Sequence, residues 1–197
     1  MMFPIFLKLE GRRCLVVGAG TVAEGKIRGL LEAGASVQVV APQAVFQIRR
    51  WQSQGAIAWK PRKFDPSDLD RVSLVVAATS LRDLNSQVFR EARLRNVLCN
   101  AVDDPENCDF YYGAVVKRGD LQIAISTNGR SPALAQRLRQ ELEEQFGPEY
   151  ESWLEELGEA RNQAIAAHLD AEARKRFLHQ LASREAFNTC AERGRTN

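Results

Sequence analysis

Three small residues, Gly18, Gly20 and Ala23, are spaced as in the turns that hold the phosphate groups of nucleotides. They follow the apolar run 14–17 and overlap the start of an amphipathic stretch, 22–32, that is typical of a helix. Gly18 allows a tight turn, Gly20 lets the backbone approach a ligand, and Ala23 lets the helix pack close to the sheet. The N–H groups and dipole at the start of such a helix would hold a pyrophosphate. The alternative is a close-packed strand–helix turn that binds no ligand.

The cysteines and histidines have no spacing typical of metal ligands or redox pairs. The four cysteines are Cys14, Cys99, Cys108 and Cys190. Cys14 and Cys99 lie in apolar runs, where a thiol packs as a small hydrophobe. The two histidines, His168 and His179, would lie about 16 Å apart along one continuous helix, too far to bind one ion together. We therefore predict no metal site, and we expect neither disulfides nor a structural zinc.

Strand and helix patterns alternate through the first half of the chain. Short apolar runs bounded by turn residues predict buried strands, and longer amphipathic stretches predict helices. The predicted strands are 14–17, 36–40, 56–60, 74–78 and 97–100, and the predicted helices are 22–32, 44–54 and 81–95. Residues 61–70 are expected to form a loop with a helical turn at 66–69. This alternation predicts an α/β fold with a Rossmann-type, doubly wound parallel sheet.

The pattern changes near Asp103. The runs 110–116 and 121–126 predict a hairpin whose turn carries the charges of Lys117 and Arg118. Ser131 and Pro132 are typical of an N-cap and a first helical residue, and that helix is expected to continue to residue 146. Helical sequence then runs from 149 to about 190, broken around 168–171, before an expected disordered tail at 193–197.

Three regions follow from these patterns. We expect a Rossmann domain at 1–113, a small α+β dimerisation and substrate region at 114–147, and a helical region at 148–197. One hairpin and a few amphipathic helices make a poor core by themselves. A homodimer interface is the economical way to bury their apolar faces.

The composition is that of an ordinary globular protein. Of the 197 residues, 45% are hydrophobic and 26% are charged, and the net charge of +2 is too small to indicate nucleic-acid binding. No apolar run approaches the roughly 20 residues needed to cross a bilayer. The short apolar N-terminus is suited to packing and lacks the pattern of a signal peptide. We expect a cytoplasmic protein with no nucleic-acid or membrane partner.

The second predicted strand departs from the usual dinucleotide-binding pattern. An Asp or Glu at its end normally binds the ribose 2′-OH of NAD, but residues 39–43 read Val-Val-Ala-Pro-Gln. Either no dinucleotide binds, or backbone groups and the Gln43 side chain hold the ribose. No arginine stands at this strand end to bind a 2′-phosphate, so nothing here favours NADP.

Several motifs together resemble the precorrin-2 dehydrogenase / sirohydrochlorin ferrochelatase family, the dehydrogenase half of siroheme synthase. They are residues 4–6, 14–26, 31–35, 77–79, 99–103 and 125–135. The resemblance covers about residues 3–146, and the strand end without an acid is itself the habit of that family. Beyond residue 146 the chain is similar only in being helical, so we expect the stand-alone form of the enzyme and not the fused siroheme synthase.

The resemblance implies an oxidoreductase that removes a hydride and protons from precorrin-2, giving sirohydrochlorin and NADH. Asp103 lies three residues after Asn100 at a predicted strand end, where open α/β sheets bind their ligands. No histidine precedes position 168, so a carboxylate is the natural base. The family assigns its essential role to the aspartate that matches Asp103, and Asp104 ranks second. Without the resemblance, the favoured interpretation of Asp103 is a turn residue before Pro105.

The cofactor and substrate residues follow from the same resemblance. The expected NAD-binding residues are Gly18, Gly20, Thr21, Val22, Pro42, Gln43, Ala78, Thr79 and Asn100. Thr21 and Val22 would offer N–H groups to the pyrophosphate, Pro42 and Gln43 would border the adenosine, and the last three would border the nicotinamide. Thr79 could instead be a helix N-cap, and Lys26 is expected to be a solvated helix residue.

The tetrapyrrole substrate carries eight carboxylates and needs donors spread over a wide cleft. A plausible carboxylate site at a helix N-terminus is formed by Asn128, Gly129, Arg130 and Ser131. Thr127 stands where some family members have a serine that can be phosphorylated. Other functions stay open: insertion of Fe²⁺ or Co²⁺ alongside oxidation, a chelatase that has lost oxidation, and a non-enzymatic nucleotide-sensing domain. Such sensing domains usually keep the strand-two acid and have no need of Asp103.

Overall fold

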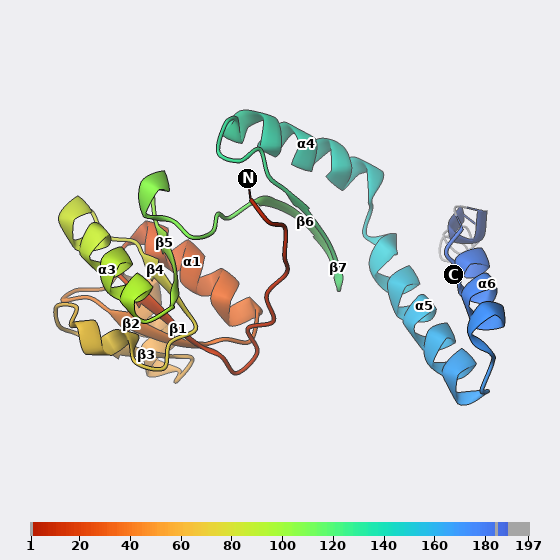
Figure 1. The fold of residues 1–197 in the computed structure, drawn as a ribbon, viewed down its shortest axis with the longest axis horizontal. Helices are drawn as coiled ribbons and strands as arrows, with labels where there is room; N and C mark the ends of the chain where they lie inside the picture. The colour runs from red at the N-terminus through yellow and green to blue at the C-terminus, as the bar shows by residue number, and fades with distance from the viewer. Residues whose placement is uncertain (1, 184, 189–197) are drawn as a thin grey trace. The chain divides into compact units, whose positions relative to one another are not determined.

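The structure is a computed structural model that describes residues 2–183 and 185–188 (Figure 1). The chain divides after Tyr112 into two compact units. Cys190 and the expected tail at 193–197 lie outside the described residues.

The first unit is built on a parallel sheet of five strands. These are β1 (Arg13–Val17), β2 (Ser36–Val40), β3 (Ile57–Lys60), β4 (Leu74–Ala77) and β5 (Leu98–Ala101), in the order β3-β2-β1-β4-β5. The central strand β1 pairs with β2 from Arg13↔Ser36 onward and with β4 from Cys14↔Leu74 onward. The predicted α/β fold with a parallel sheet is confirmed, with strand ends within one residue of those expected.

Helices cover both faces of this sheet, which explains why residues 14–17 of β1 and all of β4 are apolar. The helices are α1 (Thr21–Glu32), α2 (Phe46–Ser53) and α3 (Arg82–Leu94), with two short turns, η1 (Pro66–Leu69) and η2 (Pro105–Asn107). Val16 packs with residues of α1 and α2 on one face. Leu15 packs with residues of α3 and η1 on the other. Cys14 and Cys99 are fully buried in these clusters, as predicted, and Ala23, in the first turn of α1, is fully buried too.

Helix α2 begins two residues later than predicted. Val45 is extended, with φ −65° and ψ 161°, and acts as the N-cap. Its N–H donates to the Ala19 carbonyl across 3.0 Å, which ties it to the turn after β1 and takes it out of the helix. The predicted end of α1 is confirmed, because Gly34 follows its C-cap with a left-handed φ of +71°.

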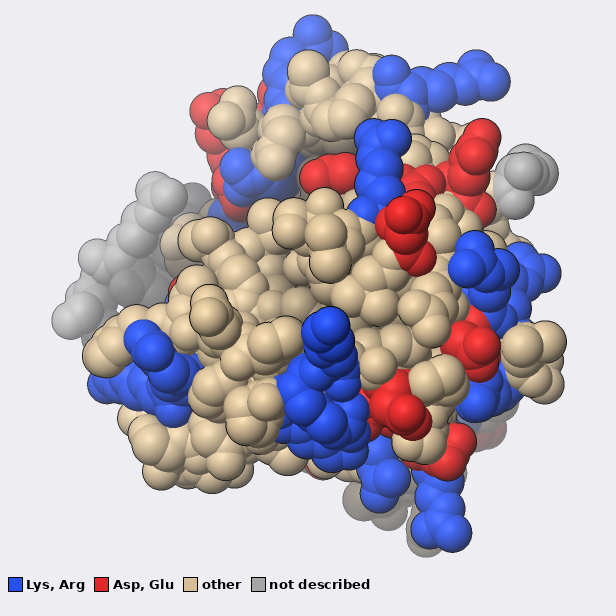
Figure 2. Space-filling view, turned by 90° about the vertical axis from the view of Figure 1, so that its left-hand side faces the viewer, with Lys and Arg blue, Asp and Glu red and all other residues tan. Residues whose placement is uncertain are grey.

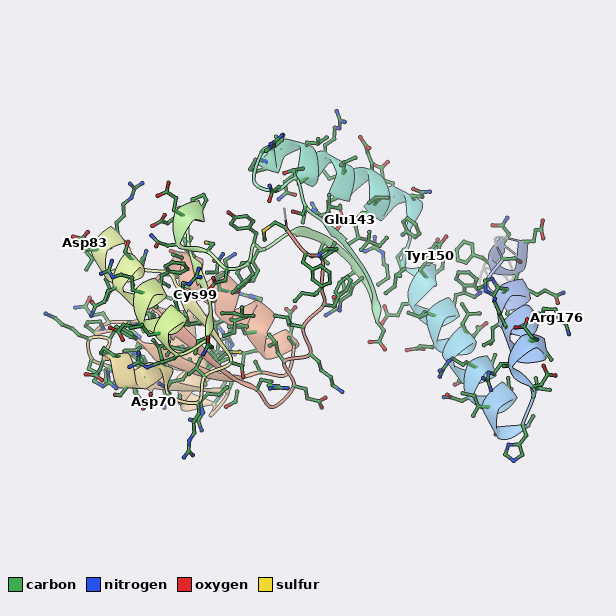
Figure 3. All side chains as sticks on the ribbon, in the orientation of Figure 1. Asp70, Asp83, Cys99, Glu143, Tyr150 and Arg176 are labelled. Carbon is green, nitrogen blue, oxygen red and sulfur yellow. The ribbon has the colours of Figure 1, made fainter. Side chains whose placement is uncertain are left out.

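The second unit contains a hairpin followed by helices. It consists of β6 (Ala114–Arg118), β7 (Leu121–Ile125), α4 (Pro132–Gln145), α5 (Glu149–Ala166) and α6 (Ala171–Leu181). The predicted hairpin and the break near residue 168 are confirmed. Ser131 caps α4 as predicted, since its Oγ accepts a 3.2 Å hydrogen bond from the Leu134 N–H. Figure 3 shows Tyr150 at the start of α5, and its ring stacks on Phe187 with centroids 4.3 Å apart.

The interpretation of Lys117 and Arg118 as turn charges is wrong. Both residues belong to β6, and the turn is made by Gly119, with φ +54°, and Asp120. Arg118 donates from Nε to the Phe146 carbonyl (2.8 Å) and from Nη2 to the Glu143 carbonyl (3.0 Å). The last carbonyls of a helix lack partners within it, so Arg118 stabilises the end of α4.

The apolar N-terminal segment does not pack as expected. Phe3 is 84% exposed, and Ile5 and Phe6 are also exposed. These residues have no regular secondary structure.

A buried carboxylate fixes the loop after β3. The Asp68 side chain is 1% exposed and accepts hydrogen bonds from Lys60 Nζ (2.9 Å) and from two nitrogens of Arg62 (2.6 and 2.7 Å). The Asp65 N–H donates to it as well, across 3.0 Å. Burial by itself would raise the pKa of Asp68, but the hydrogen bonds from Arg62 and Lys60 outweigh it and lower the pKa to about 2.

We predict that Asp68→Asn destabilises the fold in a pH-dependent way. The pKa of Asp68 is lower in the folded chain than in the unfolded chain, so its contribution is present above pH 4 and is lost as the pH falls toward 2. At pH 7 the variant should lose about 2 kcal/mol of unfolding free energy. Urea unfolding between pH 7 and pH 2.5 measures the difference, with the exposed Asp83→Asn as control. A difference that stays constant over this range would contradict the assignment.

Candidate functional site

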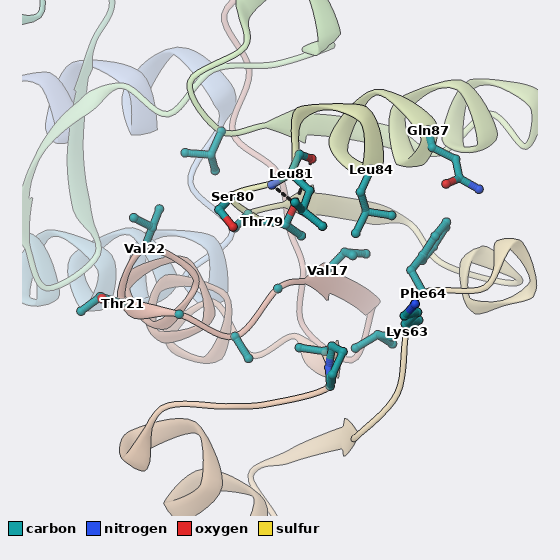
Figure 4. A pocket seen from close by; sticks show the side chains of 18 of the residues that line it. Val17, Thr21, Val22, Lys63, Phe64, Thr79, Ser80, Leu81, Leu84 and Gln87 are labelled. Atoms are coloured by element: carbon teal, nitrogen blue, oxygen red, sulfur yellow. Dashed lines mark hydrogen bonds between the residues drawn. The ribbon is translucent and has the colours of Figure 1, made fainter.

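A cleft of about 790 Å³ opens at the carboxyl ends of the parallel strands (Figure 4). The chain runs from β1 outward to β2 and β3 and then returns to the other side of β1 as β4. The turns after β1 and β4 therefore diverge, and a crevice at this switch point is where open α/β sheets bind ligands. The turn after β1, the turn after β4 and the residues that follow β5 all line the cleft.

Gly18 lets the first two turns meet. Its φ is +109°, and a Cβ at this position would lie 2.3 Å from the Ala78 carbonyl oxygen. The Gly18 N–H donates to the Val40 carbonyl (2.9 Å), and the Ala78 N–H donates to the Val17 carbonyl (2.8 Å). No side chain fits between these backbones, so glycine is required here for packing as well as for ligand approach.

The start of α1 faces the same cleft, which Thr21 and Val22 line. Gly20 is the N-cap and supplies no side-chain hydrogen bond to the first turn. A Cβ on Gly20 would meet nothing within 4 Å, so the space in front of the helix is open. The first N–H groups of a helix have no partner within it. The bare glycine, the open space and these donors fit a dinucleotide pyrophosphate.

Thr79 lines the cleft from the turn after β4, and Asn85 holds it in place. Asn85 is 3% exposed; its Oδ1 accepts from Thr79 Oγ1 (2.7 Å) and its Nδ2 donates to the Thr79 carbonyl (3.0 Å). The N-cap of α3 is Leu81, so the alternative that Thr79 is the cap is wrong. The Leu81 N–H donates to Thr79 Oγ1 across 3.1 Å (Figure 4). Sequence reasoning missed Asn85, although an amide on the inward side of a helix was a usable signal.

The part of the cleft predicted to border the adenosine differs in part from expectation. Pro42 lines it, whereas Gln43 is exposed and is not among the lining residues. Lys63 and Phe64, in the loop after β3, line it instead and were not predicted (Figure 4). Arg62 holds this loop, because Nη1 donates to the Lys63 carbonyl (2.8 Å) while the guanidinium binds Asp68. The usable signal was topological: a loop after a parallel strand lies at the ligand-binding edge.

Asp103 follows β5 and lines the cleft together with the glycine turn. It is exposed and has a left-handed φ of +59°, a conformation that Asp and Asn tolerate better than most residues. The N–H of Val102 donates to the Ala77 carbonyl across 2.9 Å, which fixes the backbone beside it. Asp104 is engaged locally, since its Oδ2 accepts a 2.7 Å hydrogen bond from Asn107 Nδ2.

Asn100 does not line the cleft. It is 6% exposed, and its Nδ2 donates to the Phe110 carbonyl across 2.8 Å. Cys108 Sγ donates to the Ala101 carbonyl (3.1 Å), and the Cys99 N–H donates to Asp109 Oδ2 (3.0 Å). These contacts tie residues 102–110 back to β5. Asn100 therefore positions the loop that carries Asp103.

Lys26 is not the solvated residue that was expected. It is half-buried, and its Nζ lies 3.7 Å from the centroid of the Tyr112 ring. Burial lowers the pKa of Lys26, and the negative charge of Asp103 opposes that shift. The ammonium and the Asp103 carboxylate therefore act on each other through space.

The four predicted substrate-binding residues lie in the second unit, between β7 and α4. Asn128 (φ +53°) and Gly129 (φ +75°) form a left-handed turn, and Asn128 and Arg130 are exposed. The Ser131 N–H donates to Thr127 Oγ1 (3.2 Å), which donates to the Ser131 carbonyl (3.1 Å). The Thr127 hydroxyl is thus engaged in this turn. A substrate role for residues 128–131 stays a prediction.

Figure 2 shows one face, on which basic and acidic side chains are mixed at the top and right, beside an uncharged area. Among the described residues, no group of three or more His, Cys, Asp or Glu side chains is arranged to hold a metal ion. In the same part of the chain, no helix combines the length and the apolar character needed to span a membrane.

Comparisons with known proteins agree with this geometry. Residues 5–114 match a family model described as "Putative NAD(P)-binding", which defines the class of the first unit. Residues 118–145 match a second model, described as "Sirohaem biosynthesis protein central". The chain belongs to the family of the first model, and the two matches together confirm the resemblance predicted from the motifs.

Individual relatives have names that agree with these two family models. The siroheme synthase of Photorhabdus laumondii is 44% identical over 140 residues, which are 71% of this chain and 30% of that protein. Siroheme synthase 2 of Yersinia enterocolitica is 38% identical over 184 residues, 93% of this chain and 39% of that protein. The chain thus spans well under half the length of these relatives. This chain also aligns with a solved structure of SirC, precorrin-2 dehydrogenase. The alignment covers all of both chains, with a TM-score of 0.80 and 27% sequence identity.

We predict that Gly18→Ala disrupts both the fold and nucleotide binding. The added Cβ would clash with the Ala78 carbonyl, and alanine is strained at φ +109°. We expect a loss of about 2–4 kcal/mol in unfolding free energy and at least a tenfold weaker Kd for NAD⁺. Chemical denaturation and calorimetric titration measure the two effects.

Gly25→Ala is the matched control for Gly18→Ala. Gly25 lies inside α1, and its added Cβ would meet nothing within 4 Å. Alanine is the better helix former by about 1 kcal/mol, so this variant should be as stable as the wild type or more so. Normal stability and NAD⁺ affinity in Gly18→Ala would show that the two turns are not constrained as described.

Proposed function

We propose that this protein oxidises precorrin-2 to sirohydrochlorin with NAD⁺ in siroheme biosynthesis. The observation that carries the proposal is the position of Asp103, an exposed carboxylate that lines the same cleft as the glycine turn and the start of α1. The names of the relatives, siroheme synthase and precorrin-2 dehydrogenase, support the same substrate class.

Different residues of the cleft bind different parts of the cofactor. The first N–H groups of α1, at Thr21 and Val22, hold the pyrophosphate. Pro42 and Phe64 border the adenosine, and the turn at Ala78 and Thr79 borders the nicotinamide. The site has no acid at the end of β2, so backbone groups hold the ribose. When bound, the cofactor supplies a hydride acceptor.

Asp103 supplies the proton acceptor. Removing two hydrogens from the tetrapyrrole releases one hydride and one proton, and the proton needs a base beside the reacting carbon. Asp103 is free to serve, whereas Asp104 is held by Asn107. Asp103 has a left-handed backbone and lines the cleft directly after β5. This requirement for a base also favours an enzyme over a nucleotide-sensing domain.

We predict that Asp103→Asn lowers kcat about 10²–10⁴-fold, the usual contribution of a general base. Asparagine tolerates φ +59° and has almost the same shape, so stability and NAD⁺ affinity should be unchanged. NADH absorbance and the sirohydrochlorin spectrum follow the reaction. Asp104→Asn is the control and should retain turnover. Normal turnover in Asp103→Asn would contradict the base assignment, whatever the activity of Asp104→Asn.

We also propose that the protein is a cytoplasmic homodimer held together through the second unit, with residues 128–131 binding substrate carboxylates. A two-stranded sheet such as β6–β7 is marginal by itself in water. Val115 on β6 is 43% exposed and Phe177 on α6 is 41% exposed, which leaves apolar surface to be covered. Symmetric pairing with a second copy would cover it.

The dimer has a direct test. Light scattering at micromolar concentration should give twice the mass of one chain. Val115→Asp should shift the mass toward the monomer, because a charge would then be buried in the interface. A monomeric wild-type chain at this concentration would rule out the proposed assembly.

A further inference from the structure

Lys26 stands out because its surroundings differ from those of an ordinary surface lysine. It lies one turn after Val22 on the same face of α1, and Val22 lines the cleft. The ammonium rests 3.7 Å from the centre of the Tyr112 ring and is partly withdrawn from water. A desolvated cation on an aromatic face is held in a defined position.

This cation has no anionic partner of its own in the described part of the first unit. None of the ion pairs there, within 4.0 Å, includes Lys26. Arg28, on the same helix, is by contrast exposed and paired with Glu24 at 3.0 Å. The Lys26 ammonium is thus kept half-buried, beside the cleft and unpaired, an arrangement that suits an incoming anion.

The surface around Lys26 is apolar and aromatic. Tyr112 is 45% exposed and packs edge to face against Phe110, with centroids 5.6 Å apart. Val22 is 54% exposed on the same side of α1. A flat ring system that carries carboxylates matches this combination of apolar surface and a single cation. The negative charge of Asp103 opposes the lowering of the Lys26 pKa by burial.

We propose that Lys26 binds a carboxylate of the tetrapyrrole and thereby orients the macrocycle toward Asp103. The proposal rests on the proposed dehydrogenase function and gives one of the substrate's acid groups a specific partner. Tyr112 fixes the position of the ammonium. Lys26 is a substrate-positioning residue, and Asp103 remains the proton acceptor.

Steady-state kinetics at saturating NAD⁺ test this role with Lys26→Met, Lys26→Arg and the control Arg28→Met. Lys26→Met should raise the KM for precorrin-2 about tenfold, as expected for the loss of one charge-assisted hydrogen bond. Its kcat should change much less, and its affinity for NAD⁺ should be unchanged. Lys26→Arg should restore most of the affinity for substrate, and Arg28→Met should behave as wild type.

Binding of sirohydrochlorin without NAD⁺, followed by tryptophan fluorescence, separates this proposal from the proposed function. Lys26→Met should weaken that binding about tenfold, whether or not the protein oxidises precorrin-2. Normal turnover with an unchanged KM in Lys26→Met would overturn the Lys26 proposal and leave the dehydrogenase function standing. A wild-type chain that binds no sirohydrochlorin would overturn the Lys26 proposal too. Equal loss of NAD⁺ affinity and thermal stability in both Lys26 variants would show a merely structural role.

Discussion

The close approach of two backbone turns, at Gly18 and Ala78, is the constraint on which the site depends. The strand order places β1 and β4 side by side, and their chains leave the sheet in different directions. Hydrogen bonds to Val40 and Val17 draw both turns toward the sheet until no side chain fits between them. The start of α1 is thereby held facing the cleft. A glycine at position 18 is thus a packing requirement that also produces a phosphate-binding geometry.

Buried polar groups hold the other turns and loops that line the cleft. Asn85 fixes the turn at Thr79, Asp68 fixes the loop that carries Phe64, and Asn100 fixes the loop that carries Asp103. Each of these side chains is buried, and each pays for its desolvation with several hydrogen bonds. The groups that contact ligands can therefore stay exposed while their backbones are rigid. Buried side chains thus hold the backbone of the cleft, and other residues line it.

The sequence predicts the sheet well because residues 14–17 of β1 and all four residues of β4 are apolar and buried. The glycine turn is also predictable from the sequence, because the spacing of its small residues follows from the local geometry of the turn. The contacts of single polar side chains are harder to predict, because their partners follow no sequence pattern. Asn100 donates to the carbonyl of Phe110, and Lys26 contacts an aromatic ring 86 positions along the chain. From sequence alone, an asparagine at a strand end is interpreted as a ligand contact, because its hydrogen-bond partner within the protein is not known. Likewise, nothing local marks Lys63 and Phe64, since only the parallel order of the strands brings their loop to the cleft.

The central claim is that the dinucleotide and Asp103 share one cleft. A crystal structure with NAD⁺ and sirohydrochlorin bound tests it most directly. The account predicts the pyrophosphate against the N–H groups of Thr21 and Val22, with the Asp103 carboxylate at the edge of the macrocycle next to the nicotinamide. A dinucleotide bound away from the glycine turn, or an Asp103 carboxylate turned away from the macrocycle, would contradict it.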